Sequence, residues 1–264
     1  MASRILVPCF SEKIVRTQIK SCENLGLWFN YFIGLDENHK PDKDTLTGQI
    51  PSADINDLLK GYHERREKLF NVLDQQGFCC RTASVHTESR LAAGMGNPNP
   101  TENGMTFQYP LGFPVIPGSS QKGIAAYYAE VFEGKKTEDP DRLRIFGSSR
   151  DDAGKGSLIF FDAYPDPYPG PTNMNLLEFD IMNPHYEPYY SDKGAKPPAD
   201  YYSPIPIRFL TVPAGIRFCF QMASRSSKDL DIAWKWLRDA LSINGIGGKT
   251  NVGYGRFRKE DFDE

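Results

Sequence analysis

Residues 243–257 read Ile-Asn-Gly-Ile-Gly-Gly-Lys-Thr-Asn-Val-Gly-Tyr-Gly-Arg-Phe. The run Gly248-Lys249-Thr250 matches the end of a phosphate-binding P-loop, but the first glycine of that motif would fall on Ile243. A P-loop also follows a strand and opens a helix, whereas this segment is expected to follow a helix and open a strand. Without a helix N-terminus behind it, the loop lacks the dipole that favours a triphosphate. Nucleotide hydrolysis is therefore disfavoured.

The composition of this glycine-rich segment suits a phosphate backbone instead. Its glycines tolerate positive φ, so backbone N–H groups can come close to a phosphate. Residues 243–259 contain no acid, and their cations are Lys249, Arg256, Arg258 and Lys259. Glycines and cations beside the aromatic residues Tyr254 and Phe257 are typical of contacts with single-stranded RNA. A tight turn that only packs a helix on a sheet would explain the glycines equally well.

A second segment, residues 116–124, reads Ile-Pro-Gly-Ser-Ser-Gln-Lys-Gly-Ile and is expected to open a helix capped by Ser119. Helix N-terminal amides and serine hydroxyls favour anions. Lys122 opposes the helix dipole there, and Gly123 weakens the helix. Two local compromises at one place indicate function rather than packing.

The rest of the chain from residue 78 predicts an α+β fold. Strands are expected over 78–88, 157–162 and Val252–Arg258, helices over 119–134 and 230–241, and a hairpin or one bent strand over 205–222. The order β-α-β-β-α-β predicts a ferredoxin-like, RRM-like sandwich with helices on one face of an antiparallel sheet. We expect this domain to span residues 78–264.

Two further parts surround this domain. Residues 24–32 and the stretch from Asp54 to Gly77 carry helical apolar faces, so residues 1–77 are expected to form a helical extension packed on the core. Residues 163–204 contain nine prolines and seven tyrosines around an alternating Leu177–Ile181 run. Prolines do not fit a central sheet, so this stretch is expected to be an inserted hairpin arm.

Composition excludes several classes of protein. The 264 residues carry 31 basic and 34 acidic side chains, a net charge of −3 that argues against a free-standing, non-specific DNA binder. The five cysteines form no CxxC pair, so reduced and mostly buried thiols are expected rather than a disulfide framework or a zinc site. Asp151-Asp152 lies in a glycine-rich loop and is expected to be solvated rather than metal-binding. No apolar run suits a membrane span or a secretory signal, and a cytoplasmic protein is expected.

Together the two motifs resemble those of the RAMP superfamily of CRISPR-associated RNA-binding proteins. Within it, Asn-Leu-Gly-Leu-Trp at 24–28 and Leu-Glu-Phe-Asp-Ile-Met-Asn-Pro-His-Tyr at 177–186 resemble the family of sixth subunits of type III-B (Cmr) effector complexes. The resemblance implies a non-catalytic backbone subunit that binds CRISPR RNA near the guide 3′ end, without cofactor or metal. The implied partners are CRISPR RNA, target RNA, the filament backbone subunit, the small helical subunit and the first RAMP subunit. The expected RNA-binding residues are Ser119, Ser120, Lys122, Gly123, Gly245, Gly247, Gly248, Lys249, Asn251 and Arg256.

Two other functions remain open. Some members of this superfamily are metal-independent ribonucleases, and a histidine would then have to reach the 2′-OH or the leaving oxygen. His39 and His63 are expected to be solvated and His185 to be structural, which leaves His86 near the expected RNA face. The third possibility is a scaffold whose loops bind only protein.

Overall fold

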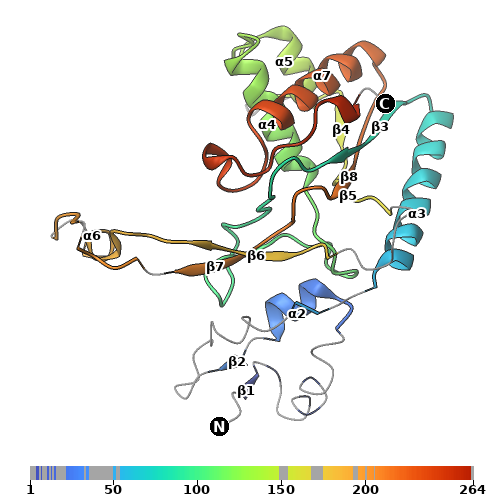
Figure 1. Cartoon of the computed structure of the whole chain (residues 1–264). Coiled ribbons are helices and arrows are strands. Elements are labelled where there is room, and N and C mark those ends of the chain that lie inside the picture. The colour runs from blue at the N-terminus through green and yellow to red at the C-terminus, as the bar shows by residue number, and fades with distance from the viewer. Residues whose placement is uncertain are drawn as a thin grey trace.

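The structure is a computed structural model (Figure 1). It describes residues 4–5, 7, 11, 13, 15, 22–32, 34–35, 50–51, 54–148, 154–167, 175–192, 196–199, 201–204 and 206–262. His39, the Asp151-Asp152 pair and one of the five cysteines, Cys9, lie outside the described residues.

The main sheet is built around β8 (Arg217–Ser224). β8 pairs antiparallel with the whole of β3 (Cys79–His86) on one side, and with β4 (Leu158–Phe160) and β5 (Tyr164–Pro165) on the other. Its side chains after Arg217 are buried on both faces, as expected for a nearly continuous apolar run in the middle of a sheet. The expected strands over 78–88 and 157–162 are confirmed, although the second is shorter.

The expected strand over Val252–Arg258 is wrong. Residues Thr250–Val252 form a short 3-10 helix, η3, and only Phe257 bridges to Thr87 beside β3. Gly253 and Gly255 have φ values of +96° and +73°, which an extended strand does not allow. A second 3-10 helix, η4 (Glu260–Phe262), closes the described chain.

Three helices cover one face of the sheet: α4 (Gly118–Val131), α5 (Pro140–Phe146) and α7 (Ser227–Ile243) (Figure 1). The α7 amphipathic pattern is confirmed, and Ser226 caps it by accepting a hydrogen bond from the Asp229 amide. α5 has no counterpart in the sequence-based prediction, although Asp139 followed by Pro140 is a helix-start signal.

α3 (Asn56–Gln75) packs on the opposite face of the sheet. Neighbouring residues of a strand point to opposite faces: Phe220 packs against Phe262 on the α7 side, while Gln221 accepts a hydrogen bond from Arg66 of α3 at 2.9 Å. His63 of the same helix lies 2.9 Å from the Tyr164 hydroxyl through Nδ1. The expectation of a solvated His63 is therefore wrong, because this residue of the charged run faces the sheet.

The inserted arm is a two-stranded antiparallel hairpin of β6 (Glu178–Met182) and β7 (Ile207–Thr211). It projects from the body and ends in α6 (Glu187–Ser191) (Figure 1). Because β7 pairs with β6, the first of the two alternatives for residues 205–222, a hairpin, is wrong. The chain bends from β7 in the arm to β8 in the main sheet, which is nearer to the second alternative, one bent strand. The arm also begins later than expected, since Tyr164 is fully buried in the main sheet.

Of the N-terminal elements, α2 packs on this core. α2 (Leu25–Tyr31) places Trp28 against Phe179 of the arm, with ring centroids 6.4 Å apart. Leu25, Trp28 and Phe29 belong to the same hydrophobic cluster as the sheet residues. Two short strands, β1 (Arg4–Ile5) and β2 (Gly34–Leu35), pair with each other. The expected helix over 24–32 is confirmed.

Two smaller observations complete the fold. None of the helices in the described parts of the chain is long and apolar enough to cross a membrane. The four described cysteines are free, and only Cys219 is fully buried, so the expectation of mostly buried thiols is wrong for Cys22, Cys79 and Cys80.

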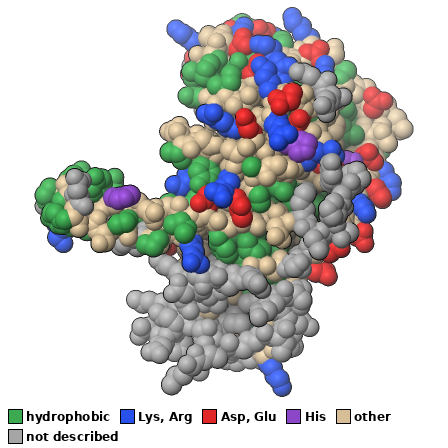
Figure 2. Space-filling model, in the orientation of Figure 1, with side chains coloured by type: hydrophobic (Ala, Val, Ile, Leu, Met, Phe, Trp, Pro, Cys, Tyr) green, Lys and Arg blue, Asp and Glu red, His purple; other side chains and the backbone are tan. Residues whose placement is uncertain are grey.

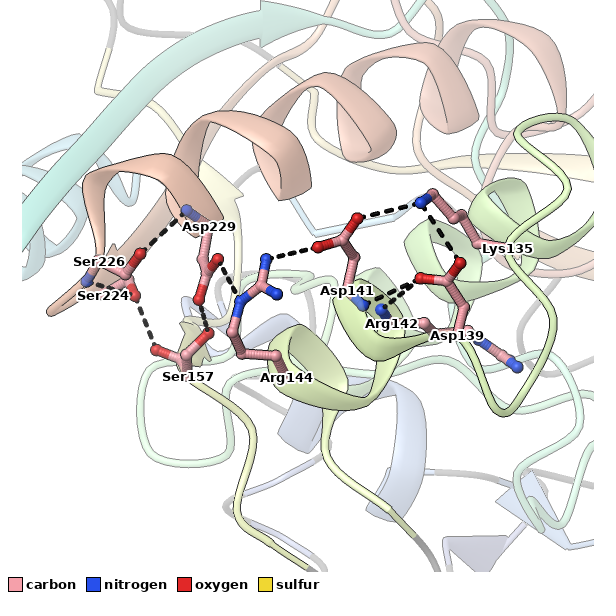
Figure 3. A network of polar contacts seen from close by, with 9 residues as sticks. All are labelled: Lys135, Asp139, Asp141, Arg142, Arg144, Ser157, Ser224, Ser226 and Asp229. Atoms are coloured by element: carbon pink, nitrogen blue, oxygen red, sulfur yellow. Dashed lines mark hydrogen bonds and ion pairs between the residues drawn. The ribbon is translucent and has the colours of Figure 1, made fainter.

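A polar network joins α5, α7 and the sheet (Figure 3). The Asp229 carboxylate, which is 2% exposed, accepts hydrogen bonds from Arg144 Nε and Ser157 Oγ, both at 2.8 Å. Arg144 also pairs with Asp141 of its own helix at 2.8 Å. The network therefore fixes the short α5 to the start of α7.

Replacing Asp229 with alanine should lower the free energy of unfolding by about 2–3 kcal/mol, because Arg144 and Ser157 lose a charged acceptor. Chemical denaturation monitored by circular dichroism measures the change. The matched control is Asp231→Ala on the same helix, where the exposed pair with Arg81 should contribute only about 0–1 kcal/mol. Equal losses in the two variants would contradict the importance of the buried network.

Candidate nucleic-acid interface

The glycine-rich segment lies against the chain that follows β3. The Gly248 amide donates to the Ala92 carbonyl at 2.8 Å, and the Gly255 amide donates to the Arg90 carbonyl at 2.7 Å. Within the segment, the Ile246 amide donates to the Gly255 carbonyl at 2.9 Å. Backbone hydrogen bonds therefore hold the segment as a fixed loop rather than a free flap.

Close backbone packing explains two of the predicted glycines. Gly245 and Gly247 have φ values of +75° and +94°, and a Cβ at either position would lie 2.6 Å from a carbonyl oxygen, of Tyr254 and Ala92 respectively. Gly248 has an ordinary backbone, and a Cβ there would lie 3.2 Å from the Met95 side chain and 3.5 Å from the Ala92 carbonyl oxygen. Packing alone accounts for Gly245 and Gly247, whereas Gly248 is under weaker constraint.

The loop presents polar and cationic side chains next to the arm. Lys249 adopts a left-handed φ of +59°, which is uncommon for a residue with a Cβ, and its Nζ lies 5.5 Å from the Phe209 ring centroid in β7. Asn251 and Arg256 are exposed. Arg256 forms no ion pair with any other described residue, so its charge is available to a ligand.

Four side chains fix this loop to the base of the arm. The Tyr254 hydroxyl donates to the Asp180 carboxylate at 2.6 Å, and Arg90 Nη1 lies 3.1 Å from the same oxygen. Arg90 Nε also donates to Glu178. We call Arg90, Glu178, Asp180 and Tyr254 the arm clamp. It joins the chain after β3, the glycine-rich loop and β6.

The charges of the arm clamp depend on pH. Burial alone would raise the Asp180 pKa, but hydrogen bonds from Tyr254 and the Ile181 amide, with the Arg90 charge, lower it below the usual value. A carboxylate with a lowered pKa stabilises the fold at neutral pH, and this contribution disappears as the pH falls through the lowered value. Burial and the bond to Asp180 raise the Tyr254 pKa to about 12, so the phenol remains a donor across the physiological range.

The first turn of α4 holds the other predicted residues. The helix begins at Gly118, one residue earlier than expected, so Ser119 is not its cap. A Cβ at position 118 would lie 2.2 Å from the Phe160 carbonyl oxygen, and the Gly118 amide donates to the Asp162 carboxylate at 2.8 Å. That carboxylate already occupies an anion-favouring position, so the helix terminus attracts phosphate less than expected.

The side chains of this turn nevertheless face solvent. Ser119, Ser120, Lys122 and Gly123 are all exposed. Among the described residues, no hydrogen bond or ion pair joins them to the glycine-rich loop. The structure therefore places the two predicted groups on separate elements, with Ser119–Gly123 beside the link between β4 and β5.

His86 is held by a carboxylate. Asp261 Oδ2 accepts from the His86 backbone amide at 2.7 Å and lies 2.8 Å from Nδ1 of its ring. Such a pair can orient an imidazole, although a ribonuclease also needs the ring within reach of the scissile nucleotide. No group of three or more His, Cys, Asp or Glu side chains suited to a metal lies within the described residues.

Comparison with known proteins gives consistent matches. A family model described as "RAMP superfamily" matches residues 84–258. A CRISPR system Cmr subunit Cmr6 from Pyrococcus furiosus is 32% identical over 76% of this chain and 72% of its own. A Cmr6 subunit from Saccharolobus solfataricus is 30% identical over 94% of this chain and 84% of its own. A chain in a structure of the type III-B Cmr-beta complex bound to cognate target RNA superposes with a TM-score of 0.58 at 22% identity, covering 96% and 75% of the two chains.

Replacing Tyr254 with phenylalanine should loosen the arm clamp while keeping the aromatic ring. The loss of a bond to a charged acceptor should lower the opening free energy of the β6 amides by about 1.5–3 kcal/mol. Native-state hydrogen exchange over Glu178–Met182 measures this change. Tyr201→Phe near the tip of the arm is the control and should leave the exchange unchanged. Unaltered exchange in Tyr254→Phe would show that the clamp does not hold the arm.

Proposed function

The chain belongs to the RAMP superfamily and, within it, to the Cmr6 family of CRISPR subunits, and we propose that it binds CRISPR RNA as a non-catalytic backbone subunit of a type III-B (Cmr) effector complex. The observation that carries the proposal is the fixed glycine-rich loop, which presents Lys249, Asn251 and Arg256 beside a projecting arm. A loop of this kind can follow a phosphate backbone without reading its sequence.

We infer that the body is a ferredoxin-like sandwich. In support, the pairing order runs from the Phe257 bridge through β3 and β8 to β4. Helix α4 connects β3 to β4, and α7 connects β8 to the Phe257 bridge. We accordingly treat residues 1–77 as an extension and residues 78–264 as the RAMP domain, whose last strand is reduced to the bridge.

The proposed RNA contacts are those of the two motifs. Ser119, Ser120 and Lys122 would meet the backbone through exposed side chains, and Gly123 adds no bulk to that surface, since a Cβ there would meet nothing within 4 Å. Gly245 and Gly247 shape the loop, and Gly248 allows close approach to it. Because Asp162 already accepts from the Gly118 amide, the favourable charge at α4 would come from Lys122 rather than from the helix terminus.

The arm is proposed to be a contact element for the duplex or a neighbouring subunit. Its described tip exposes Tyr190 at 70% and Tyr201 at 78%, and Figure 2 shows hydrophobic side chains gathered around that end. Tyrosines give large contact areas with a polar group at one end, which suits a macromolecular interface. The proposed partners are CRISPR RNA, target RNA, the filament backbone subunit, the small helical subunit and the first RAMP subunit, in the cytoplasm near the guide 3′ end.

The second candidate function is a metal-independent endoribonuclease. The His86–Asp261 pair favours it, because a carboxylate can orient the imidazole of a general acid or base. Guide or target RNA cleaved by the wild type, and left intact by His86→Ala, would support this function against the non-catalytic one.

The double replacement of Lys122 and Lys249 with alanine should weaken binding of single-stranded RNA and reduce its salt dependence. Each lost phosphate contact lowers the slope of log affinity against log salt by about 0.7 for single strands. Fluorescence anisotropy at several salt concentrations measures both quantities. Lys68→Ala, an exposed lysine of α3 outside both motifs, is the control. Wild-type affinity and slope in the double variant would mean that the RNA path lies elsewhere.

Trimming the arm should prevent assembly without unfolding the body. Met182 pairs with Ile207, so Asn183–Pro206 can be replaced by a short glycine turn between these two residues. None of the described residues in the removed part belongs to the main hydrophobic cluster, and the thermal unfolding midpoint should stay near that of the wild type. Reconstitution with guide RNA and the other subunits measures incorporation. Normal incorporation of the trimmed chain would contradict an assembly role for the tip.

A further inference from the structure

A cavity of about 440 Å³ lies between α2 and the loop of residues 97–110. Its lining residues are Asn24, Gly26, Leu27, Asn30, Tyr31, Asn97, Met105, Thr106, Phe107, Tyr109 and Pro110. Neither of the two RNA-binding motifs contributes a residue to it. We propose that this cavity binds one unpaired base of the RNA whose backbone follows the glycine-rich loop, an inference that rests on the proposed function.

The lining has the chemistry of a base site. It combines aromatic rings with carboxamide and hydroxyl groups, and none of its described lining residues is Lys, Arg, Asp or Glu. An unpaired RNA base is an uncharged ring that stacks on aromatic faces and forms hydrogen bonds at its edges. A phosphate, in contrast, would find no cation among these described residues. The volume also falls in the range of pockets that enclose small ligands.

The aromatic and polar groups are open to a ligand. Tyr31 is 47% exposed and Tyr109 is 78% exposed, so both rings present free faces at the rim. Asn97 donates through Nδ2 to Thr106 Oγ1 at 3.2 Å. The side-chain oxygen of Asn97, Oδ1, accepts no hydrogen bond within the described part of the chain. An acceptor of this kind can pair with an exocyclic amino group of a base.

Glycines packed behind the lining keep it in one shape. A Cβ at Gly94 would lie 2.0 Å from Thr106 Oγ1, and one at Gly104 would lie 2.5 Å from the Asn97 carbonyl. Gly112, with φ of +78°, would place a Cβ 2.3 Å from Asn24 Oδ1. At these three points the glycine backbone lies so close to its neighbour that a side chain would not fit. A wall fixed before binding reduces the entropy lost on binding.

One chain segment, residues 92–97, links the cavity to the proposed RNA path. Residues 92–97 touch the glycine-rich loop at one end, where Ala92 accepts from the Gly248 amide and Met95 lies beside Gly248, and they line the cavity at the other end through Asn97. Six residues span at most about 20 Å. A strand whose backbone is held at the loop can therefore bring the base of a nucleotide a short way along it to the cavity.

The test uses the full chain and labelled single-stranded RNA of guide length. Tyr109→Ala should weaken binding about tenfold, in line with the loss of one base-stacking contact. The slope of log affinity against log salt should stay at its wild-type value, because the replaced tyrosine carries no charge and contacts no phosphate. Tyr109→Phe keeps the ring and should bind like the wild type. Replacing the RNA by a ribose-phosphate chain of the same length without bases should abolish the difference between Tyr109→Ala and the wild type.

The outcomes separate this inference from the proposed function. If the wild type binds RNA and depends on Lys122 and Lys249, but Tyr109→Ala binds equally well, the base site is wrong while the function stands. A protein anchor in the cavity would also leave RNA affinity unchanged and would overturn the inference. If the slope of log affinity against log salt falls in Tyr109→Ala, the cavity contacts phosphate and not a base, and the inference is again wrong. If the wild type does not bind RNA, the proposed function itself fails.

Discussion

The burial of β8 on both faces is the constraint on which the rest of the structure depends. A strand with apolar side chains on both sides needs a cover on each face, and α7 and α3 supply the two covers. In ordinary RRM domains one face of the sheet remains open to stack bases. Here Arg66 and His63 of α3 occupy that face through Gln221 and Tyr164. The proposed nucleic-acid contacts therefore lie on the loops at the edge of the sheet and on the arm, rather than on the sheet face.

The arm clamp then connects those loops to one another. Arg90, Tyr254 and Asp180 come from three segments that are far apart in sequence, and each contacts at least one of the others. Lys249 adds a contact to Phe209 on the second strand of the arm. A ligand that displaces Lys249 or Arg90 therefore acts on the base of the arm directly, since the same side chains belong to both.

Much of the fold could be predicted from local patterns. Helix α7 follows from its apolar period and the Ser226 cap, and β6 follows from the alternation of residues 177–181. The pairing of the strands with one another could not be predicted in the same way. The pattern of residues 207–211 indicates a strand, but nothing in it distinguishes pairing with β6 from pairing with β8. Val252–Arg258 failed as a strand because the backbone angles of Gly253 and Gly255 override its composition.

In the candidate site, too, the local features could be predicted from the sequence and the long-range contacts could not. The two motifs identified the loop and the start of α4, because glycines, serines and lysines at close spacing are a local signal. The bond from Gly118 to Asp162 spans 44 residues, and that from Tyr254 to Asp180 spans 74, so neither has a local signature. The cavity between α2 and the loop of residues 97–110 was missed for this reason, although Gly94, Gly104 and Gly112 in and around that loop were visible in the sequence. A two-stranded arm has one further consequence for the free chain. The outer edges of β6 and β7 carry backbone groups with no third strand to pair with in the described chain. Such edges can template pairing between molecules, so the isolated protein is expected to be prone to self-association in proportion to its concentration.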